Sequence, residues 1–293
     1  EKKILNYPFD LGEKSFIVDR EIMSLFEDDK GYLWIGTRRN GLVIVKTGDI
    51  FRKGKKAEFI QYLQGQNPGD LSYRTILDIF KDNNDQLWIG THGGGINFVE
   101  SRNQRFGHIF YNDFRKNTLS YNKVWGITED NNGDLWIGTD GDGINIWDHG
   151  KGVTKIYRHE EEKENSLSDN AVISALSDSK DRLWFGTYEG GLNRYNTKKD
   201  AFLHYGPSEG LPSQDIRCIY EDGNQEIWVG MNRAGIARYN EKKDIFEHIE
   251  ITSMYDVRSI FATGDILWLG TYSFGLIKYD SRTGILHTFD QLS

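Results

Sequence analysis

The sequence predicts an all-β fold that is assembled from one repeated unit of four short antiparallel strands. The pattern Leu-Trp-Ile-Gly-Thr, intact or with one to three substitutions, recurs six times, with tryptophans at positions 34, 88, 136, 184, 228 and 268. The apolar runs are short, rich in β-branched and aromatic residues, and bounded by Gly, Asn and Asp. The chain also holds 32 glycines but only 4 prolines, which suits many hairpin turns. Units of roughly 40–50 residues with four strands are typical of β-propeller blades.

The third copy shows how each unit is organised. An apolar stretch over 124–130 leads through a turn at 131–134 into the pentad at 135–139. A second turn follows at 140–143, and two more strands are predicted over 144–148 and 154–157. The pentad is apolar on both of its alternating faces, so this strand must be covered on both sides, as when a blade packs between two neighbours.

Two glycines recur within each unit. The glycine that lies two residues after the tryptophan fits a strand crowded by a close backbone approach. A second glycine in the following turn is expected to supply a positive φ angle in a hairpin. This turn glycine is present in all six copies, as Gly41, Gly95, Gly143, Gly191, Gly235 and Gly275.

The two ends of the sequence bear on the number of blades. Residues 3–7 look like the outer strand of a preceding blade, whereas 284–289 supply the fourth strand of the last copy. Six complete repeats plus a spare N-terminal outer strand fit a six-bladed ring, or most of a seven-bladed ring. In either case residues 1–293 are predicted to form a single propeller domain or a propeller fragment. The one cysteine, Cys218, cannot form an intrachain disulfide and is expected to be a core thiol.

Charge and hydropathy argue against two classes of partner. The formal net charge is -8 at pH 7, so attraction to phosphate backbones or anionic membranes is not expected, and no nucleic-acid partner is predicted. No run of 18 apolar residues occurs, so direct membrane insertion is not expected either.

The residue patterns do not favour an enzyme, a metal site or a cofactor. The acids that precede the pentads, Asp28, Asp82, Asp130, Asp178 and Asp222, repeat with the fold and are expected to cap hairpins through the backbone. The seven histidines lack metal-ligand spacing, and the 130–134 turn lacks the glutamate that closes an EF-hand loop. A carbohydrate-active hydrolase or lyase is the least favoured alternative, for which Asp140, Asp142 and Glu189 would be the acids to test first.

Candidate binding residues are found where the six copies differ within a constant frame. In a propeller, the turn after the second strand and the connection into the next first strand lie on one face, around the axial mouth. Aromatic rings there can stack on sugar faces, while arginines, amides and carboxylates can hold hydroxyl or acidic groups. The candidates are Arg38, Arg39, Asn40, Tyr73, Arg74, His92, Tyr121, Lys123, Asp140, Asp142, Tyr188, Glu189, Asn232, Arg233, Tyr255, Tyr272 and Phe274.

At the pentads and the turns before them the chain resembles the two-component regulator propeller repeats. The segments 27–37 and 129–139 match that pattern throughout, while Met231 replaces threonine in the fifth copy and the turn at 262–265 is shorter in the sixth. The resemblance implies the periplasmic sensor region of a membrane-spanning histidine kinase, often a hybrid kinase and regulator of Bacteroides-type bacteria that detects oligosaccharides. In that family two propellers precede an immunoglobulin-like domain, a membrane helix and the kinase.

Three functions therefore compete. The first is an extracytoplasmic propeller that senses a ligand, with an oligosaccharide as the expected partner. The second is a structural propeller whose face contacts a neighbouring propeller or a partner subunit and binds no small ligand. The third is the carbohydrate-active enzyme named above.

Overall fold

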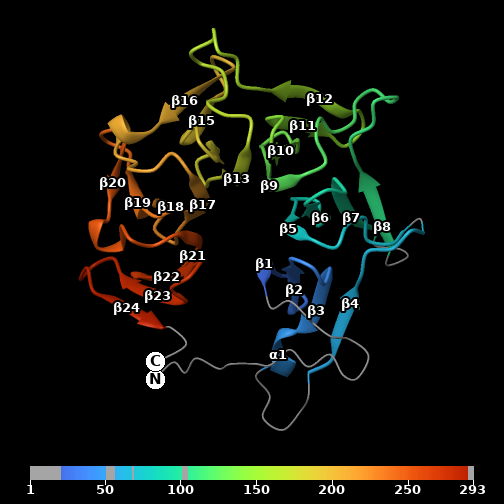
Figure 1. The fold of residues 1–293 in the computed structure, drawn as a ribbon, viewed down its shortest axis with the longest axis horizontal. Helices are drawn as coiled ribbons and strands as arrows, with labels where there is room; N and C mark the ends of the chain where they lie inside the picture. The colour runs from blue at the N-terminus through green and yellow to red at the C-terminus, as the bar shows by residue number, and fades with distance from the viewer. Residues whose placement is uncertain (1–20, 51–56, 68, 101–104, 290–293) are drawn as a thin grey trace. The chain divides into compact units, whose positions relative to one another are not determined.

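The structure is a computed structural model that describes residues 21–50, 57–67, 69–100 and 105–289. Its strands form six four-stranded antiparallel sheets, and each sheet uses four strands that are consecutive in the chain (Figure 1). This confirms the predicted fold class, a β-propeller of six four-stranded blades with almost no helix. The spare strand predicted at 3–7 lies outside the described residues.

The strand bounds follow the repeats. The sheets contain β1 (Ile22–Glu27), β2 (Tyr32–Thr37), β3 (Leu42–Lys46) and β4 (Phe59–Tyr62); β5 (Ile76–Lys81), β6 (Leu87–Thr91), β7 (Ile96–Glu100) and β8 (Arg105–Ile109); β9 (Val124–Glu129), β10 (Leu135–Thr139), β11 (Ile144–Asp148) and β12 (Gly152–Tyr157). They continue with β13 (Val172–Ser177), β14 (Leu183–Thr187), β15 (Leu192–Asn196) and β16 (Ala201–Tyr205); β17 (Ile216–Glu221), β18 (Ile227–Met231), β19 (Gly235–Asn240) and β20 (Ile245–His248); β21 (Val257–Thr263), β22 (Ile266–Thr271), β23 (Leu276–Asp280) and β24 (Leu286–Phe289). Short helical turns lie at α1 (Thr47–Ile50), η1 (Pro207–Glu209) and η2 (Glu250–Thr252).

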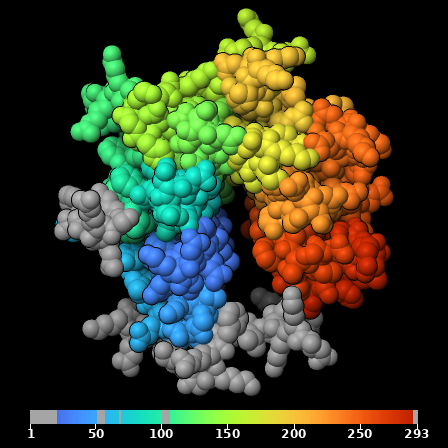
Figure 2. Space-filling view, turned by 180° about the vertical axis from the view of Figure 1, so that it is seen from behind, coloured from blue at the N-terminus to red at the C-terminus, as the bar shows by residue number. Residues whose placement is uncertain are grey.

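The chain divides into two compact units, 1–124 and 125–293. In the first unit, β1 contacts β5 of the following sheet. In the second unit the sheets follow one another in chain order, from green to red in Figure 2, and β13 contacts β17 as β17 contacts β21. The first strands of these sheets lie on the inner side of the unit and the fourth strands on its outer side (Figure 1).

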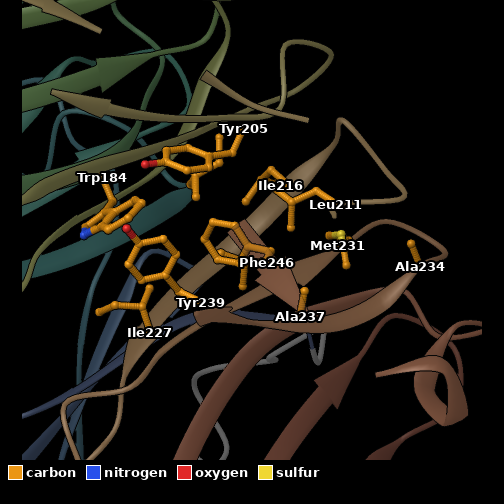
Figure 3. Packing of buried hydrophobic residues seen from close by; sticks show 12 residues of the cluster. Trp184, Tyr205, Leu211, Ile216, Ile227, Met231, Ala234, Ala237, Tyr239 and Phe246 are labelled. Atoms are coloured by element: carbon orange, nitrogen blue, oxygen red, sulfur yellow. The ribbon is translucent and has the colours of Figure 1, made fainter. Parts of the chain in front are cut away.

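The core of the second unit consists of layers of side chains between successive sheets. Trp184 is fully buried between the fourth and fifth sheets, with its ring centroid 5.7 Å from that of Tyr205 and 5.1 Å from that of Tyr239. Figure 3 shows these rings gathered at one end of the cluster, with Leu211 and Met231 at the other. Cys218 is partly buried and packs against the next layer, between the fifth and sixth sheets.

Each tryptophan of the first five copies is fixed by the acid six residues before it. In the fourth sheet, Asp178 Oδ1 accepts hydrogen bonds from the backbone N–H groups of Lys180 and Arg182, while its Oδ2 accepts one from Trp184 Nε1 at 2.8 Å. Asp28, Asp82, Asp130 and Asp222 repeat this arrangement. The predicted hairpin caps are confirmed, and each carboxylate also orients the ring that fills the adjacent layer. In the sixth sheet Ala262 stands at this position.

The pentad glycine makes room for the following sheet. A Cβ atom on Gly186 would lie 2.8 Å from Ile216 Cγ2, and one on Gly138 would lie 2.7 Å from Val172 Cγ1. Since Ile216 and Val172 begin the first strands of the next sheets, the predicted close approach is confirmed. The six turn glycines have φ angles between 66° and 78°, as the hairpin prediction requires.

We expect Asp178→Ala to lower the free energy of unfolding by about 3 kcal/mol, because it leaves a buried indole N–H and backbone N–H groups without their acceptor. Denaturant unfolding measures the change. Asp265→Ala is the control, since this carboxylate lies in the corresponding region of the sixth sheet and is 54% exposed; its effect should stay within about 0.5 kcal/mol. Equal losses in the two variants would contradict this role for Asp178.

Gly186→Ala should destabilise the chain by about 2 kcal/mol, because the added methyl group overlaps the next sheet. Gly270→Ala is the matched control, since a Cβ atom there would meet only Ser259 of its own sheet within 4 Å. Thermal unfolding of the two variants should therefore differ by several degrees. A Gly270→Ala variant as unstable as Gly186→Ala would show that the crowding arises within one sheet.

Candidate functional site

The candidate residues of the first unit lie on four connections. Arg38, Arg39 and Asn40 lie between β2 and β3, Tyr73 and Arg74 before β5, His92 between β6 and β7, and Tyr121 and Lys123 before β9. The rings of Tyr73 and His92 stack, with their centroids 6.2 Å apart. Arg38 pairs with Glu21 at 2.6 Å. Asn40 is buried, and its N–H donates to Thr37 Oγ1, so it supports the turn.

The candidates of the second unit occupy corresponding turns. Asp140 and Asp142 lie between β10 and β11, Tyr188 and Glu189 between β14 and β15, Asn232 and Arg233 between β18 and β19, Tyr255 before β21, and Tyr272 and Phe274 between β22 and β23. Asp142 accepts two hydrogen bonds from Arg158, at 2.7 and 2.9 Å. Tyr255 is buried edge-on against Phe274, with the centroids 5.2 Å apart.

A β-bulge adds residues that the sequence analysis missed. The register between the first and second strands shifts by one residue in the first, second, fourth, fifth and sixth sheets, at Met23, Leu77, Ile173, Arg217 and Arg258 respectively. A bulge turns the side chain of its extra residue away from the normal alternation. The position is apolar in three of these sheets and arginine in the last two. The signal in the sequence was the repeated triplet Asp-Ile-Arg at 215–217 and Asp-Val-Arg at 256–258.

In the fifth sheet the arginine is held by its own triplet and by the preceding sheet. Arg217 donates a hydrogen bond to Asp215 Oδ2, and Asn232 Nδ2 donates to the same oxygen at 2.8 Å. The Arg217 guanidinium lies 5.1 Å from the centre of the Tyr188 ring. The side chains of Arg217 and Asp215 are only 12% and 13% exposed. Burial raises the pKa of the Asp215 carboxyl, although Arg217 and Asn232 act in the opposite direction.

The sixth sheet has a similar arginine–aspartate pair nearer to solvent, but its tyrosine ring belongs to the same sheet as the arginine. Arg258 donates to Asp256 Oδ2 at 2.6 Å and lies 5.2 Å from the centre of the Tyr272 ring. Asp256 is 12% exposed at its side chain, Arg258 is 37% exposed, and Tyr272 is 76% exposed. The charge of Arg258 also acts to lower the pKa of Asp215, so the two pairs are electrostatic neighbours.

The structure thus brings three predicted residues together with four that join them. We call this set the paired-arginine cluster: Tyr188, Asp215, Arg217, Asn232, Asp256, Arg258 and Tyr272. Its two carboxylates balance its two guanidinium groups. A hollow of about 460 Å³ is lined in part by Glu189 and Gln214, the chain neighbours of Tyr188 and Asp215, but by none of the cluster residues themselves. Hydrogen-bond donors, acceptors and aromatic faces side by side are suited to binding a hydroxylated ligand.

Neither a metal centre nor a membrane span is evident in the part of the chain that the structure describes. No group of three or more His, Cys, Asp or Glu side chains in that part could hold a metal ion. Among the same residues, no helix combines the length and the apolar character that crossing a bilayer requires.

Comparison with known proteins identifies the repeat. A family model described as "Two component regulator propeller" matches residues 17–39, 70–93, 118–141, 166–189 and 210–233. The chain belongs to the two-component regulator propeller family. Each match ends in the turn that follows the pentad strand, and the resemblance noted in the sequence is confirmed. No curated protein sequence matches the chain.

Solved structures with the same fold include extracellular domains of hybrid two-component systems. The extracellular domain of B. thetaiotaomicron BT4673, described as a hybrid two component system, is 26% identical, with a TM-score of 0.75 over 92% of this chain and 36% of its own. The corresponding domain of BT3049 is 24% identical, with a TM-score of 0.75; the match covers 93% of this chain and 35% of that domain. Virginiamycin B lyase from Staphylococcus aureus is 16% identical, with a TM-score of 0.68; the match covers 93% of this chain and 85% of the lyase. At this identity the similarity is one of fold alone. The propeller spans about a third of the two-component domains.

We expect Arg217→Met to destabilise the propeller by about 3 kcal/mol, because it leaves the buried Asp215 carboxylate without its cation. The double variant Asp215→Asn/Arg217→Met should lose less than the sum of its single variants, because both charges are then absent. Denaturant unfolding of the three variants measures the coupling. Arg158→Met, which breaks the more exposed pair with Asp142, is the control and should cost about 1 kcal/mol or less. Additive losses at positions 215 and 217 would contradict the pairing.

Proposed function

We propose that this propeller is the ligand-binding part of an extracytoplasmic sensor in a two-component signalling protein, and that its ligand is an oligosaccharide. The observation that carries the proposal is the paired-arginine cluster on a propeller of the two-component regulator family. The extracellular placement of the similar B. thetaiotaomicron domains supports a periplasmic location. The signalling output then belongs to other parts of the parent receptor.

The chemistry of the cluster supports a sugar. Tyr188 and Tyr272 are 45% and 76% exposed, so their rings can pack against the apolar face of a pyranose. Arginine, aspartate and asparagine side chains beside them can exchange hydrogen bonds with hydroxyl groups. The cluster is built on turns and bulges of three successive sheets, so its groups are positioned by a rigid scaffold.

A protein contact is the second candidate function, and one observation favours it. Met254, Phe261 and Ile285, in or next to the sixth sheet, are each more than half exposed. They lie before β21, in β21 and before β24 respectively, and large exposed apolar side chains are found at interaction surfaces. A neighbouring propeller or a partner subunit of the parent receptor could cover them. No enzymatic role is proposed, because the similarity to the lyase is one of fold alone.

Isothermal titration of the chain with a panel of oligosaccharides tests the sensor proposal. We expect saturable binding to at least one of them, weakened about fivefold or more by Tyr272→Ala through loss of a stacking ring. Phe114→Ala is the control, because this ring is 98% exposed and lies in the first unit. An absence of binding across the panel would favour the protein-contact function instead.

A further inference from the structure

We infer that the paired-arginine cluster recognises adjacent hydroxyl groups of a neutral sugar and discriminates against sugars that carry carboxylate or sulfate groups. The inference rests on the proposed function and narrows its ligand class. It is carried by the way in which both arginines are already joined to a carboxylate of their own triplet.

Each pair presents a donor and an acceptor next to one another. A guanidinium group has five N–H donors, and an ionised carboxylate has only acceptors. One hydroxyl of a vicinal diol can accept from the arginine while the adjacent hydroxyl donates to the aspartate. A free carboxylate or sulfate ester has no proton to donate, so it satisfies only half of such a pair.

The pairs also retain hydrogen-bonding capacity that the described residues do not use. Asp215 Oδ1, Arg217 Nε and Asp256 Oδ1 are buried and have no hydrogen-bond partner among the described residues. These atoms are closed to solvent, so a ligand reaches them only when neighbouring side chains move, and it then satisfies polar groups whose burial without a partner is unfavourable. Asp215 Oδ1 and Asp256 Oδ1 each lack a hydrogen-bond donor, and a sugar hydroxyl group can supply one.

The charge balance of the cluster opposes an anionic ligand. Arg217 and Arg258 are each neutralised by an aspartate less than a fifth exposed at its side chain. The Asp169 carboxylate accepts a hydrogen bond from the backbone N–H of Glu189, so two more acids lie on the turns next to Tyr188. An anion would therefore have to displace a carboxylate from its arginine or approach without a compensating charge.

The cluster contains the same kinds of group twice, an arginine, an aspartate and a tyrosine ring, and an oligosaccharide likewise contains several similar sugar residues. The ring separations are nearly the same, 5.1 Å for Arg217 and Tyr188 and 5.2 Å for Arg258 and Tyr272, but Tyr188 belongs to the preceding sheet whereas Tyr272 belongs to the sheet of Arg258. They arise from the bulges of the adjacent strands β17 and β21. One oligosaccharide that spans both pairs can therefore meet the same kinds of group twice.

The test compares neutral and acidic probes on the same protein. Neutral xylo-, manno-, galacto- and gluco-oligosaccharides are titrated alongside oligogalacturonate and chondroitin sulfate oligosaccharides, in low and high salt. We expect a neutral probe to bind with an affinity that changes less than about twofold between 0.05 and 0.5 M NaCl, because no net charge is paired. The acidic probes should bind at least tenfold more weakly.

Two variants of the sixth sheet locate the binding. Asp256→Asn/Arg258→Gln removes both charges at once, and Arg258→Lys keeps the charge but removes the planar fork; each should weaken the neutral probe about tenfold. Arg238→Gln is the matched control, because Arg238 is also 37% exposed, ion-paired and stacked on a ring, but on the third strand β19. It should leave the affinity unchanged, and melting temperatures confirm that the variants are folded.

The outcomes separate this inference from the proposed function. A tighter acidic probe that is lost in the Asp256 and Arg258 variants overturns the neutral-sugar inference and leaves the sensor standing. A neutral probe that binds equally well to both folded variants also overturns the inference, since the cluster is then only a structural brace. Failure of every sugar to bind overturns the proposed function together with the inference.

Discussion

The hydrogen bond from the pentad tryptophan of the first five sheets to the acid six residues before it is the interaction on which the rest of this propeller depends. It ties the hairpin between the first two strands to the ring that fills the layer between sheets, so local turn geometry and interblade packing are set by one carboxylate. The glycine two residues later then admits the first strand of the next sheet. Since five of the six sheets use this hydrogen bond, the loops beyond this frame can vary without disturbing it.

The sequence predicted the frame well because repetition turns weak local signals into a strong one. Hairpin glycines such as Gly143, capping acids such as Asp178 and the four-strand unit were all predicted and confirmed. The role of Asp178 as an acceptor for Trp184 was not predicted, because the six-residue separation brings two side chains together only after the hairpin has formed.

The candidate site was predicted only in part, for a physical reason. Tyr188, Asn232 and Tyr272 lie on turns that differ between copies, and variation of this kind can be read from the repeats. Arg217 and Arg258 lie inside strands, where alternation alone places a side chain on one sheet face or the other. The bulge redirects them, and a bulge depends on strand register, which is decided by pairing across the whole sheet. Conversely, Asn40 and Tyr255 lie on predicted turns but are buried as supports.

The paired-arginine cluster depends both on the repeated frame of the sheets and on the β-bulges and variable turns that depart from it. A crystal structure of the propeller soaked with a neutral oligosaccharide tests its role most directly. We expect a sugar ring packed on Tyr272, with neighbouring hydroxyls within hydrogen-bonding distance of Arg258 and Asp256. A sugar bound elsewhere, with both arginine pairs untouched, would contradict it.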